Sequence, residues 1–88
     1  MTSILIVDDH PGFRAGLRGA LETIPGFQIA GEAGHGLEAL EMVAATRPDI
    51  VLLDINLPGI DGLALTKLLR EPYPQTAVII VSLYGDES

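Results

Sequence analysis

Three short apolar runs, rich in isoleucine, valine and leucine, dominate the chain and limit the folds it can adopt. They cover residues 4–7, 50–53 and 77–81. Runs that are apolar on both faces are typical of strands buried inside a parallel sheet. A fourth segment, residues 27–33, alternates apolar and polar side chains, which predicts a strand at the edge of the sheet.

Helical patterns separate these runs. Residues 11–24, 37–46 and 61–70 carry apolar side chains at three- and four-residue spacing, which predicts three amphipathic helices. Pro11 suits a first helical turn, and Pro25 with the following glycine ends the first helix. Because strands and helices alternate along the chain, we expect an α/β fold with a parallel sheet and right-handed crossovers.

Composition excludes several classes of function. Five Lys and Arg residues face twelve Asp and Glu residues, for a formal net charge of −7 over 88 residues. The basic residues are scattered, so we expect no direct binding to nucleic acid. No apolar stretch approaches about 18 residues, so no membrane span is expected, and the first residues lack the basic region of a secretory signal. Because the chain has no cysteine, disulfides and thiolate sites are excluded.

The last expected strand, residues 77–81, would leave the sheet poorly protected. Three helices for four strands cover one face of a sheet only thinly. An entirely apolar strand at an open edge also favours pairing with another chain. We therefore expect a homodimer or an oligomer that exchanges elements between chains.

Polar side chains follow three of the expected strands. Asp8 and Asp9 follow the first, Asp54 follows the third and Ser82 follows the fourth. Because parallel strands end at the same edge, these side chains converge if their strands are neighbours. Grouped carboxylates repel one another and need a cation, and oxygen ligands without sulfur suit Mg²⁺ or Ca²⁺. This pattern predicts phosphoryl chemistry at a Mg²⁺ site, with an aspartate as covalent acceptor.

The same acids also have a purely structural interpretation. Asp8 and Asp9 can end a strand and cap the next helix, and Asp54 can simply end a strand. The coincidence of polar residues at three separate strand ends favours a site over this alternative.

Other polar residues carry less information. Asp61 is expected to cap the third helix at its N-terminus. His10 and His35 do not form a metal-binding pair at a recognisable spacing, and His10 is expected to help cap the helix that begins at Pro11. Phosphate-binding loops and hydrolase motifs are absent from the sequence.

Four segments together resemble the receiver domain of bacterial two-component response regulators. They are Ile-Leu-Ile-Val-Asp-Asp-His-Pro at 4–11, Pro-Asp-Ile-Val-Leu-Leu-Asp at 48–54, Leu-Pro-Gly-Ile-Asp-Gly at 57–62 and Val-Ile-Ile-Val-Ser at 78–82. The Asp-Asp-His-Pro motif is similar to that of the NarL/LuxR-type subfamily. The resemblance implies a flavodoxin-like, three-layer α/β fold with strand order 2-1-3-4 and one receiver domain over residues 1–88.

The resemblance also implies roles for individual residues. Asp54 would accept a phosphoryl group from the phosphohistidine of a sensor histidine kinase. Asp9 and Asp54 would ligate Mg²⁺, with Asp8 close by through water and the backbone carbonyl of Asn56 as a further ligand. Ser82 would contact a phosphoryl oxygen and report phosphorylation by moving. The chain would then be a cytoplasmic signalling module rather than an enzyme, controlling transcription through an effector domain outside this sequence.

The C-terminal end departs from the family pattern. A complete receiver has a fourth helix, a fifth strand and a fifth helix, and a lysine on the fifth strand contacts the phosphoryl group. The single lysine of this chain is Lys67, which lies in the third expected helix and cannot take that role. We therefore expect a receiver that is incomplete at its C-terminus, either a fragment of a longer regulator or a shortened form.

Two other functions remain open at this point. A phosphorylation-silent, receiver-like module would keep the fold and act by dimerising or by titrating a kinase. A phosphatase of the haloacid dehalogenase type also places an aspartate after an apolar strand, but it needs an acid two residues later, where this chain has Asn56.

Overall fold

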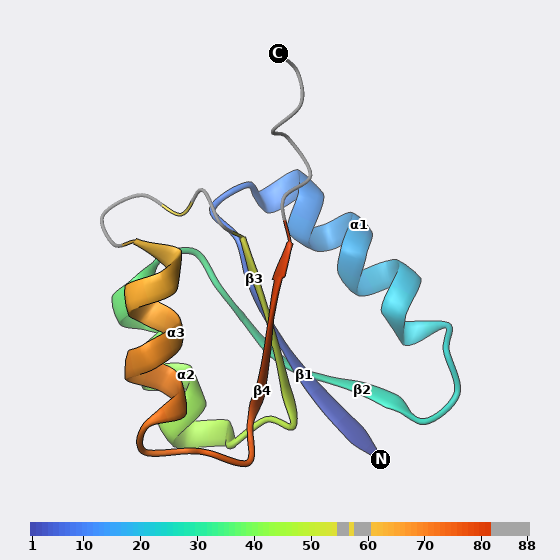
Figure 1. Cartoon of the computed structure of the whole chain (residues 1–88). Coiled ribbons are helices and arrows are strands. Elements are labelled where there is room, and N and C mark those ends of the chain that lie inside the picture. Colours follow the sequence, from blue (N-terminus) through green and yellow to red (C-terminus); the bar gives the residue numbers. More distant parts are fainter. Residues whose placement is uncertain (55–56, 58–60, 82–88) are drawn as a thin grey trace.

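A parallel sheet forms the middle layer of the protein, with helices on both of its faces (Figure 1). The computed structural model describes residues 1–54, 57 and 61–81. The elements of this part of the chain are β1 (Thr2–Val7), α1 (Pro11–Glu22), β2 (Phe27–Ala33), α2 (Gly36–Thr46), β3 (Ile50–Asp54), α3 (Gly62–Arg70) and β4 (Ala77–Val81).

The strands of the sheet lie in the order β2-β1-β3-β4, and every pair is parallel. This order confirms the expected arrangement, with the alternating segment 27–33 at one edge. In the pairing of β1 with β3, Val7 lies beside Leu53. In the pairing of β3 with β4, Asp54 lies beside Val81. The carboxyl ends of β1, β3 and β4 therefore meet at one edge of the sheet.

The main core lies between the sheet and the layer formed by α2 and α3 (Figure 1). Alternate strand residues point to this face, and the apolar stripes of both helices pack against them. The buried members with at most 1% exposure are Leu5, Val7, Ala33, Ala39, Val43, Val51, Leu53, Leu65 and Leu69. Because these side chains come from both central strands and both helices, the core holds the carboxyl ends of β1 and β3 in place.

The opposite face of the sheet is covered unevenly. Helix α1 packs against β2 and β1, where Ile4 and Ile6 are buried. On β4, Val78 packs against the main core, so the next residue, Ile79, points to the opposite face, where it is 48% exposed. The burial on both faces that the composition of the 77–81 run predicts is therefore wrong for this face, whereas the expected thin cover of one face is confirmed, because α1 crosses the other half of the sheet.

The helix ends follow local chemistry with small shifts. Helix α1 ends at Glu22, two residues before the predicted end, and the chain then turns through Gly26 with φ +89°, a conformation that glycine adopts without strain. At α3, the side chain of Asp61 accepts a hydrogen bond from the amide of Leu63 (3.3 Å), as expected of an N-cap.

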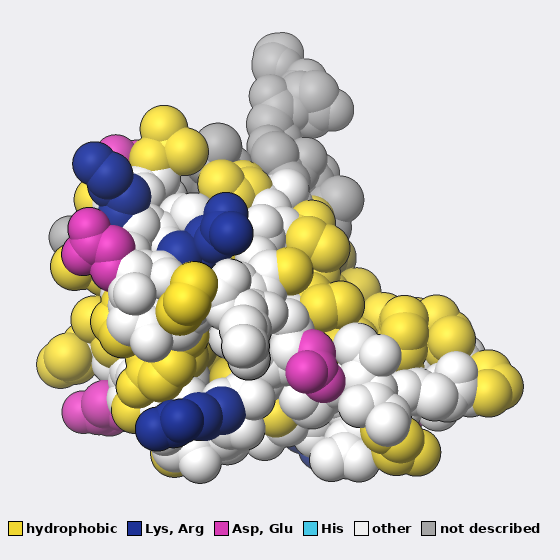
Figure 2. All heavy atoms as spheres, turned by 60° about the horizontal axis from the view of Figure 1, so that its bottom comes forward, with side chains coloured by type: hydrophobic (Ala, Val, Ile, Leu, Met, Phe, Trp, Pro, Cys, Tyr) yellow, Lys and Arg dark blue, Asp and Glu magenta, His cyan; other side chains and the backbone are white. Residues whose placement is uncertain are grey.

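The surface carries no continuous basic stripe on the face shown in Figure 2, where the Lys and Arg side chains lie apart from one another. This agrees with the scattered positions of these residues in the sequence. Within residues 1–54, 57 and 61–81, none of the helices is long and apolar enough to cross a membrane.

Candidate functional site

The carboxyl ends of β1 and β3 bring three aspartates together. Asp8 follows β1, Asp54 ends β3, and the register of these neighbouring strands sets the two residues side by side. Both are 3% exposed, whereas the side chain of Asp9 is 33% exposed. One ligand atom from each of these residues and one from His10 lie within 4.8 Å of one another. The predicted convergence of Asp8, Asp9 and Asp54 is thus present in the geometry.

Backbone hydrogen bonds fix Asp8 at the end of its strand. Its amide donates to the carbonyl of Ala33 on β2 (3.0 Å). Its carboxylate oxygen Oδ1 accepts from the amide of His10 (2.7 Å), a local turn in which an aspartate side chain binds the backbone two residues later. Pro11 then begins α1. The side chain of Asp8 is therefore held against the sheet edge rather than turned to solvent.

His10 is a member of this cluster that the sequence interpretation missed. It occupies the N-cap position of α1, but its side chain makes no capping hydrogen bond, so its expected capping role is wrong. Its ring atom Nδ1 instead lies 3.1 Å from Asp8 Oδ1 and 2.9 Å from Asp9 Oδ1. The available signal was its position directly after two acids at a strand end.

Arg14, one turn into α1, was missed as well. Its Nη1 donates to the backbone carbonyl of Asp8 (2.7 Å), and its Nε donates to Glu32 of β2 (3.2 Å). This guanidinium therefore ties the helix to the segment that carries the acids. Position 14 lies four residues after His10, on the helix face that turns back toward β1.

Glu32 is shared by two arginines. Arg18 Nη1 donates to its second carboxylate oxygen (2.8 Å), and this bond, assisted by Arg14, lowers the pKa of the Glu32 carboxyl below its ordinary value. A carboxyl with a lowered pKa contributes stability above its unfolded pKa and loses it as acid protonates the group. The link between α1 and β2 therefore weakens under acidic conditions.

The two arginines allow a matched test of the Arg14 contact. We expect Arg14→Met to lower the free energy of unfolding by about 1.5–3 kcal/mol, because it removes a hydrogen bond from a charged group to a partly buried carbonyl. Arg18→Met removes a contact to the same Glu32 and one to Glu22 without touching Asp8, and we expect a smaller loss. Urea unfolding measures both, and faster amide exchange at Asp9 and His10 should appear in Arg14→Met alone. Equal losses would contradict the anchoring role of Arg14.

Two expected site residues, Asn56 and Ser82, lie outside the described residues. Ser82 directly follows Val81, the β4 residue paired with Asp54. Lys67 lies in α3, as expected, near the C-terminal end of that helix. The positions of Asn56 and Ser82 as ligand and phosphoryl contact therefore stay predictions.

The donor chemistry of the aspartate cluster fits a small, hard dication. Three carboxylates with ligand atoms within 4.8 Å carry like charges, and a nearby cation favours their ionised forms. Mg²⁺ takes oxygen ligands, commonly one or two carboxylates, and keeps water molecules in its remaining positions. The residues present therefore suit Mg²⁺.

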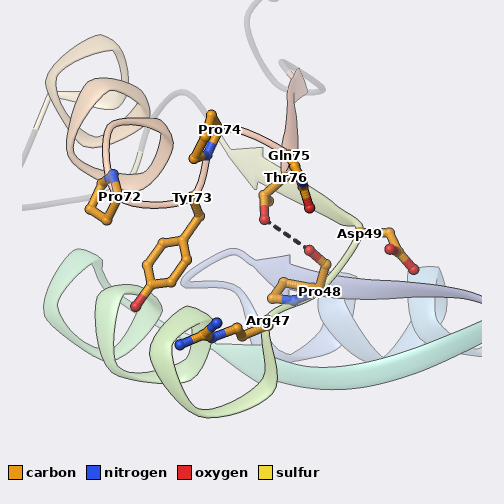
Figure 3. Close-up of a pocket in the computed structure, with 8 residues that line it drawn as sticks. All are labelled: Arg47, Pro48, Asp49, Pro72, Tyr73, Pro74, Gln75 and Thr76. Atoms are coloured by element: carbon orange, nitrogen blue, oxygen red, sulfur yellow. Dashed lines mark hydrogen bonds between the residues drawn. The ribbon is translucent and has the colours of Figure 1, made fainter.

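A separate cavity of about 280 Å³ lies at the opposite edge of the sheet, before the starts of β3 and β4 (Figure 3). The guanidinium of Arg47 lies over the ring of Tyr73, 5.5 Å from its centre. The hydroxyl of Thr76 donates to the carbonyl of Pro48 (2.9 Å), and Asp49 accepts from the amide and the hydroxyl of Ser3. These polar groups are thus engaged in holding the loops together, at the edge away from the aspartates.

Comparison with known proteins decides the family. The profile of the response regulator receiver domain matches residues 4–88. The chain belongs to the response regulator receiver family. Its sequence is 38% identical over 85 residues to the transcriptional regulatory protein DegU of Brevibacillus brevis, covering 97% of this chain and 36% of that protein.

A solved receiver shares the fold. The signal receiver domain of the putative response regulator NarL from Mycobacterium tuberculosis superimposes with a TM-score of 0.83 at 33% identity, covering 98% of this chain and 69% of that one. These relatives confirm the NarL/LuxR-type resemblance and the flavodoxin-like fold of the receiver.

The chain also matches part of a protein that is named as an enzyme. A protein-glutamate methylesterase/protein-glutamine glutaminase of Hahella chejuensis is 41% identical over 82 residues, which are 93% of this chain and 23% of that protein. The chain thus spans about a quarter to two-fifths of the curated relatives it matches.

Proposed function

We propose that this receiver is a phosphoacceptor, in which Asp54 takes a phosphoryl group from the phosphohistidine of a sensor histidine kinase in the presence of Mg²⁺. The observation that carries this proposal is the meeting of Asp8, Asp9 and Asp54 within 4.8 Å at the ends of two adjacent strands. Bound Mg²⁺ would neutralise charge on the transferring phosphoryl group.

The residues of the chain supply position and charge. In the proposed transfer, a carboxylate oxygen of Asp54 forms a bond to phosphorus while the bond from phosphorus to the donor imidazole nitrogen breaks. Asp54 is nearly buried at the end of a central strand, which fixes its carboxylate for attack. Asp8, Asp9 and Asp54 would hold the ion, with the carbonyl of Asn56 as a further ligand, and Ser82 would contact a phosphoryl oxygen.

The wider role follows from the same proposal. The relatives DegU and NarL are named as regulators, and DegU as a transcriptional one, so we propose that the phosphorylated receiver controls transcription through an effector domain outside these 88 residues. A sensor kinase makes its phosphohistidine from ATP, and ATP is available in the cytoplasm. We therefore propose that the module acts in the cytoplasm. In this role the chain is a switch and not an enzyme.

Intact mass spectrometry tests the proposal. The chain is incubated with acetyl phosphate and Mg²⁺, and a parallel sample contains EDTA. We expect one phosphoryl adduct in the Mg²⁺ sample, none with EDTA, and loss of the adduct on treatment with hydroxylamine, which cleaves acyl phosphates. If a folded sample forms no adduct, the phosphorylation-silent interaction module becomes the better description.

We also propose that two copies associate through β4. Within the described residues this strand forms an edge of the sheet, its five residues are all apolar, and Ile79 is 48% exposed. An unpaired apolar edge strand offers backbone groups and side chains to a second chain. A homodimer, or an oligomer that exchanges elements, would cover it.

Sedimentation at several protein concentrations checks this association. We expect the parent chain to show a concentration-dependent dimer and Ile79→Lys to shift it toward monomer by at least about tenfold in dissociation constant, because a lysine at the edge opposes strand pairing. Leu37→Lys, at a 65% exposed position on α2, is the matched control and should leave the dimer unchanged. A folded parent that stays monomeric at every concentration would contradict the proposal.

A further inference from the structure

The guanidinium of Arg14 lies where α1 meets the carboxyl ends of β1 and β2. Its Nη1 donates to the carbonyl of Asp8 (2.7 Å) and its Nε donates to the carboxylate of Glu32 (3.2 Å). The side chain is 21% exposed, so these bonds are shielded from much of the solvent. The planar fork of an arginine loses little freedom when it makes two such bonds at once.

The bond to Asp8 also fixes the next residue. The carbonyl of Asp8 and the amide of Asp9 belong to one planar peptide group. The amide of Asp8 already donates to Ala33 (3.0 Å), so with Arg14 in place the chain is held on both sides of the Asp8 Cα. Asp9 lies beyond the last residue of β1, and its side chain is 33% exposed, against 4% for Asp8. The direction in which Asp9 projects therefore depends on this peptide group more than on packing.

Gly34 leaves the space that the guanidinium occupies. A Cβ atom at this position would lie 2.9 Å from Arg14 Nη1, closer than real contacts of this kind, and 3.7 Å from Glu38 Oε1. The same Glu38 oxygen accepts from the Gly34 amide (2.8 Å), which holds this segment in place. Among the described glycines, a positive φ occurs at Gly26 and not at Gly34. The absence of a side chain at 34 thus serves the neighbouring guanidinium rather than a turn.

We propose that Arg14 is a positioning residue of the acidic site. By holding the peptide group between Asp8 and Asp9, it sets the Asp9 carboxylate relative to that of Asp54. The inference rests on the proposed function, because the position of Asp9 matters only if the cluster works as a phosphoacceptor site. Small displacements of groups that position a reaction have large effects on its rate. A merely structural Arg14 would instead only fasten α1 to the sheet.

The dependence of phosphorylation on Mg²⁺ separates these two roles. Phosphoryl incorporation from acetyl phosphate is followed by intact mass over a range of Mg²⁺ concentrations. We expect Arg14→Met to raise the half-saturating Mg²⁺ concentration by about tenfold or more, while the rate at saturating Mg²⁺ stays within about threefold of the parent. A loss of folded protein alone would lower the amount of adduct and leave the half-saturating concentration unchanged.

Two further variants of the arginines serve as controls. Arg18→Met removes the same charge from α1 and a bond to the same Glu32, and it should keep the half-saturating Mg²⁺ concentration of the parent. Arg14→Lys keeps the charge but replaces the two-pronged donor by a single ammonium, so it should lie between Arg14→Met and the parent. Equal half-saturating concentrations in Arg14→Met and Arg18→Met would overturn the inference.

Gly34→Ala displaces the guanidinium without removing it. We expect this substitution alone to raise the half-saturating Mg²⁺ concentration by about threefold. In the Arg14→Met background it should have no further effect, because the group that the new methyl would displace is gone. The same increase in both backgrounds would show that the methyl acts on something other than Arg14, which contradicts the inference.

Amide spectra test the positioning role without metal or phosphoryl donor. The Asp9 amide shares its peptide group with the carbonyl that Arg14 binds, so we expect its proton and nitrogen resonances to move in Arg14→Met and in Gly34→Ala and to stay in place in Arg18→Met. An unmoved Asp9 amide in Arg14→Met would overturn the inference. If the parent forms no adduct at all, the proposed function fails, and these spectra still decide whether Arg14 positions Asp9.

Discussion

Asp54→Asn should reduce phosphoryl incorporation from acetyl phosphate by on the order of 10³-fold or more, to the background of the assay. Asparagine has nearly the same size and shape as aspartate, but its uncharged amide replaces the nucleophilic carboxylate. The substitution also removes one of the three carboxylates of the cluster, so Mg²⁺ binding should weaken at the same time. Intact mass after incubation with Mg²⁺ measures the effect.

A charge-matched control separates chemistry from net charge. Glu41→Gln removes the same single negative charge from an exposed position on α2, and its phosphoryl incorporation should equal that of the parent. Circular dichroism of all three proteins establishes that each is folded. If Asp54→Asn kept the adduct, the acceptor would be another residue, and peptide mapping of the adduct would identify it.

Leu53→Ala should lower the free energy of unfolding by about 3–5 kcal/mol, which is much of the total stability of a small domain. Leu53 is fully buried in the core between the sheet and α2 and α3. Truncation there leaves a cavity that the packed helices cannot close. Urea unfolding, followed by circular dichroism, measures the loss.

The neighbouring residue provides the control for this prediction. Leu52 is half-buried on the opposite face of the same strand, where α1 does not lie directly over β3 and β4. We expect Leu52→Ala to lower the free energy of unfolding by about 1–2 kcal/mol, because folding removes less apolar area from water at this half-buried position than at Leu53. Equal losses for the two substitutions would mean that this face is also covered in solution, as it would be by a second copy docked over β4.

The order and type of the elements could be predicted because each depends on local pattern. The apolar runs and the helical stripes gave every strand and helix of the described chain, with ends shifted by one or two residues. The run at 77–81 marks the limit of that reasoning. Its composition is that of a buried strand, yet Ile79 is half-exposed, because the sequence of a strand does not state which helix covers it.

The candidate site was predictable in part for the same reason. Asp8 and Asp54 lie at the ends of apolar strands, and parallel strands end at the same edge of a sheet. These two rules place the aspartates side by side once β1 and β3 are neighbours, as in the strand order that the family resemblance implied. The position of His10 after two acids was a signal for the site, but the contacts of His10 and Arg14 were not predictable, because they depend on where a side chain turns after the fold has formed. His10 occupies a capping position but points to the acids, and Arg14 bonds a carbonyl six residues before it.

The sequence by itself determined the α/β class, the succession of strands and helices, and the aspartates at the strand ends, since these follow from residue periodicity and from the chemistry of single positions. Only the tertiary structure decided three further features. They are the exposure of Ile79 on β4, the contact of Arg14 with the carbonyl of Asp8, and the turn of the His10 ring toward Asp8 and Asp9. Each of these depends on contacts between residues distant in the chain or on a side-chain rotation selected by packing, and neither is encoded in a local pattern.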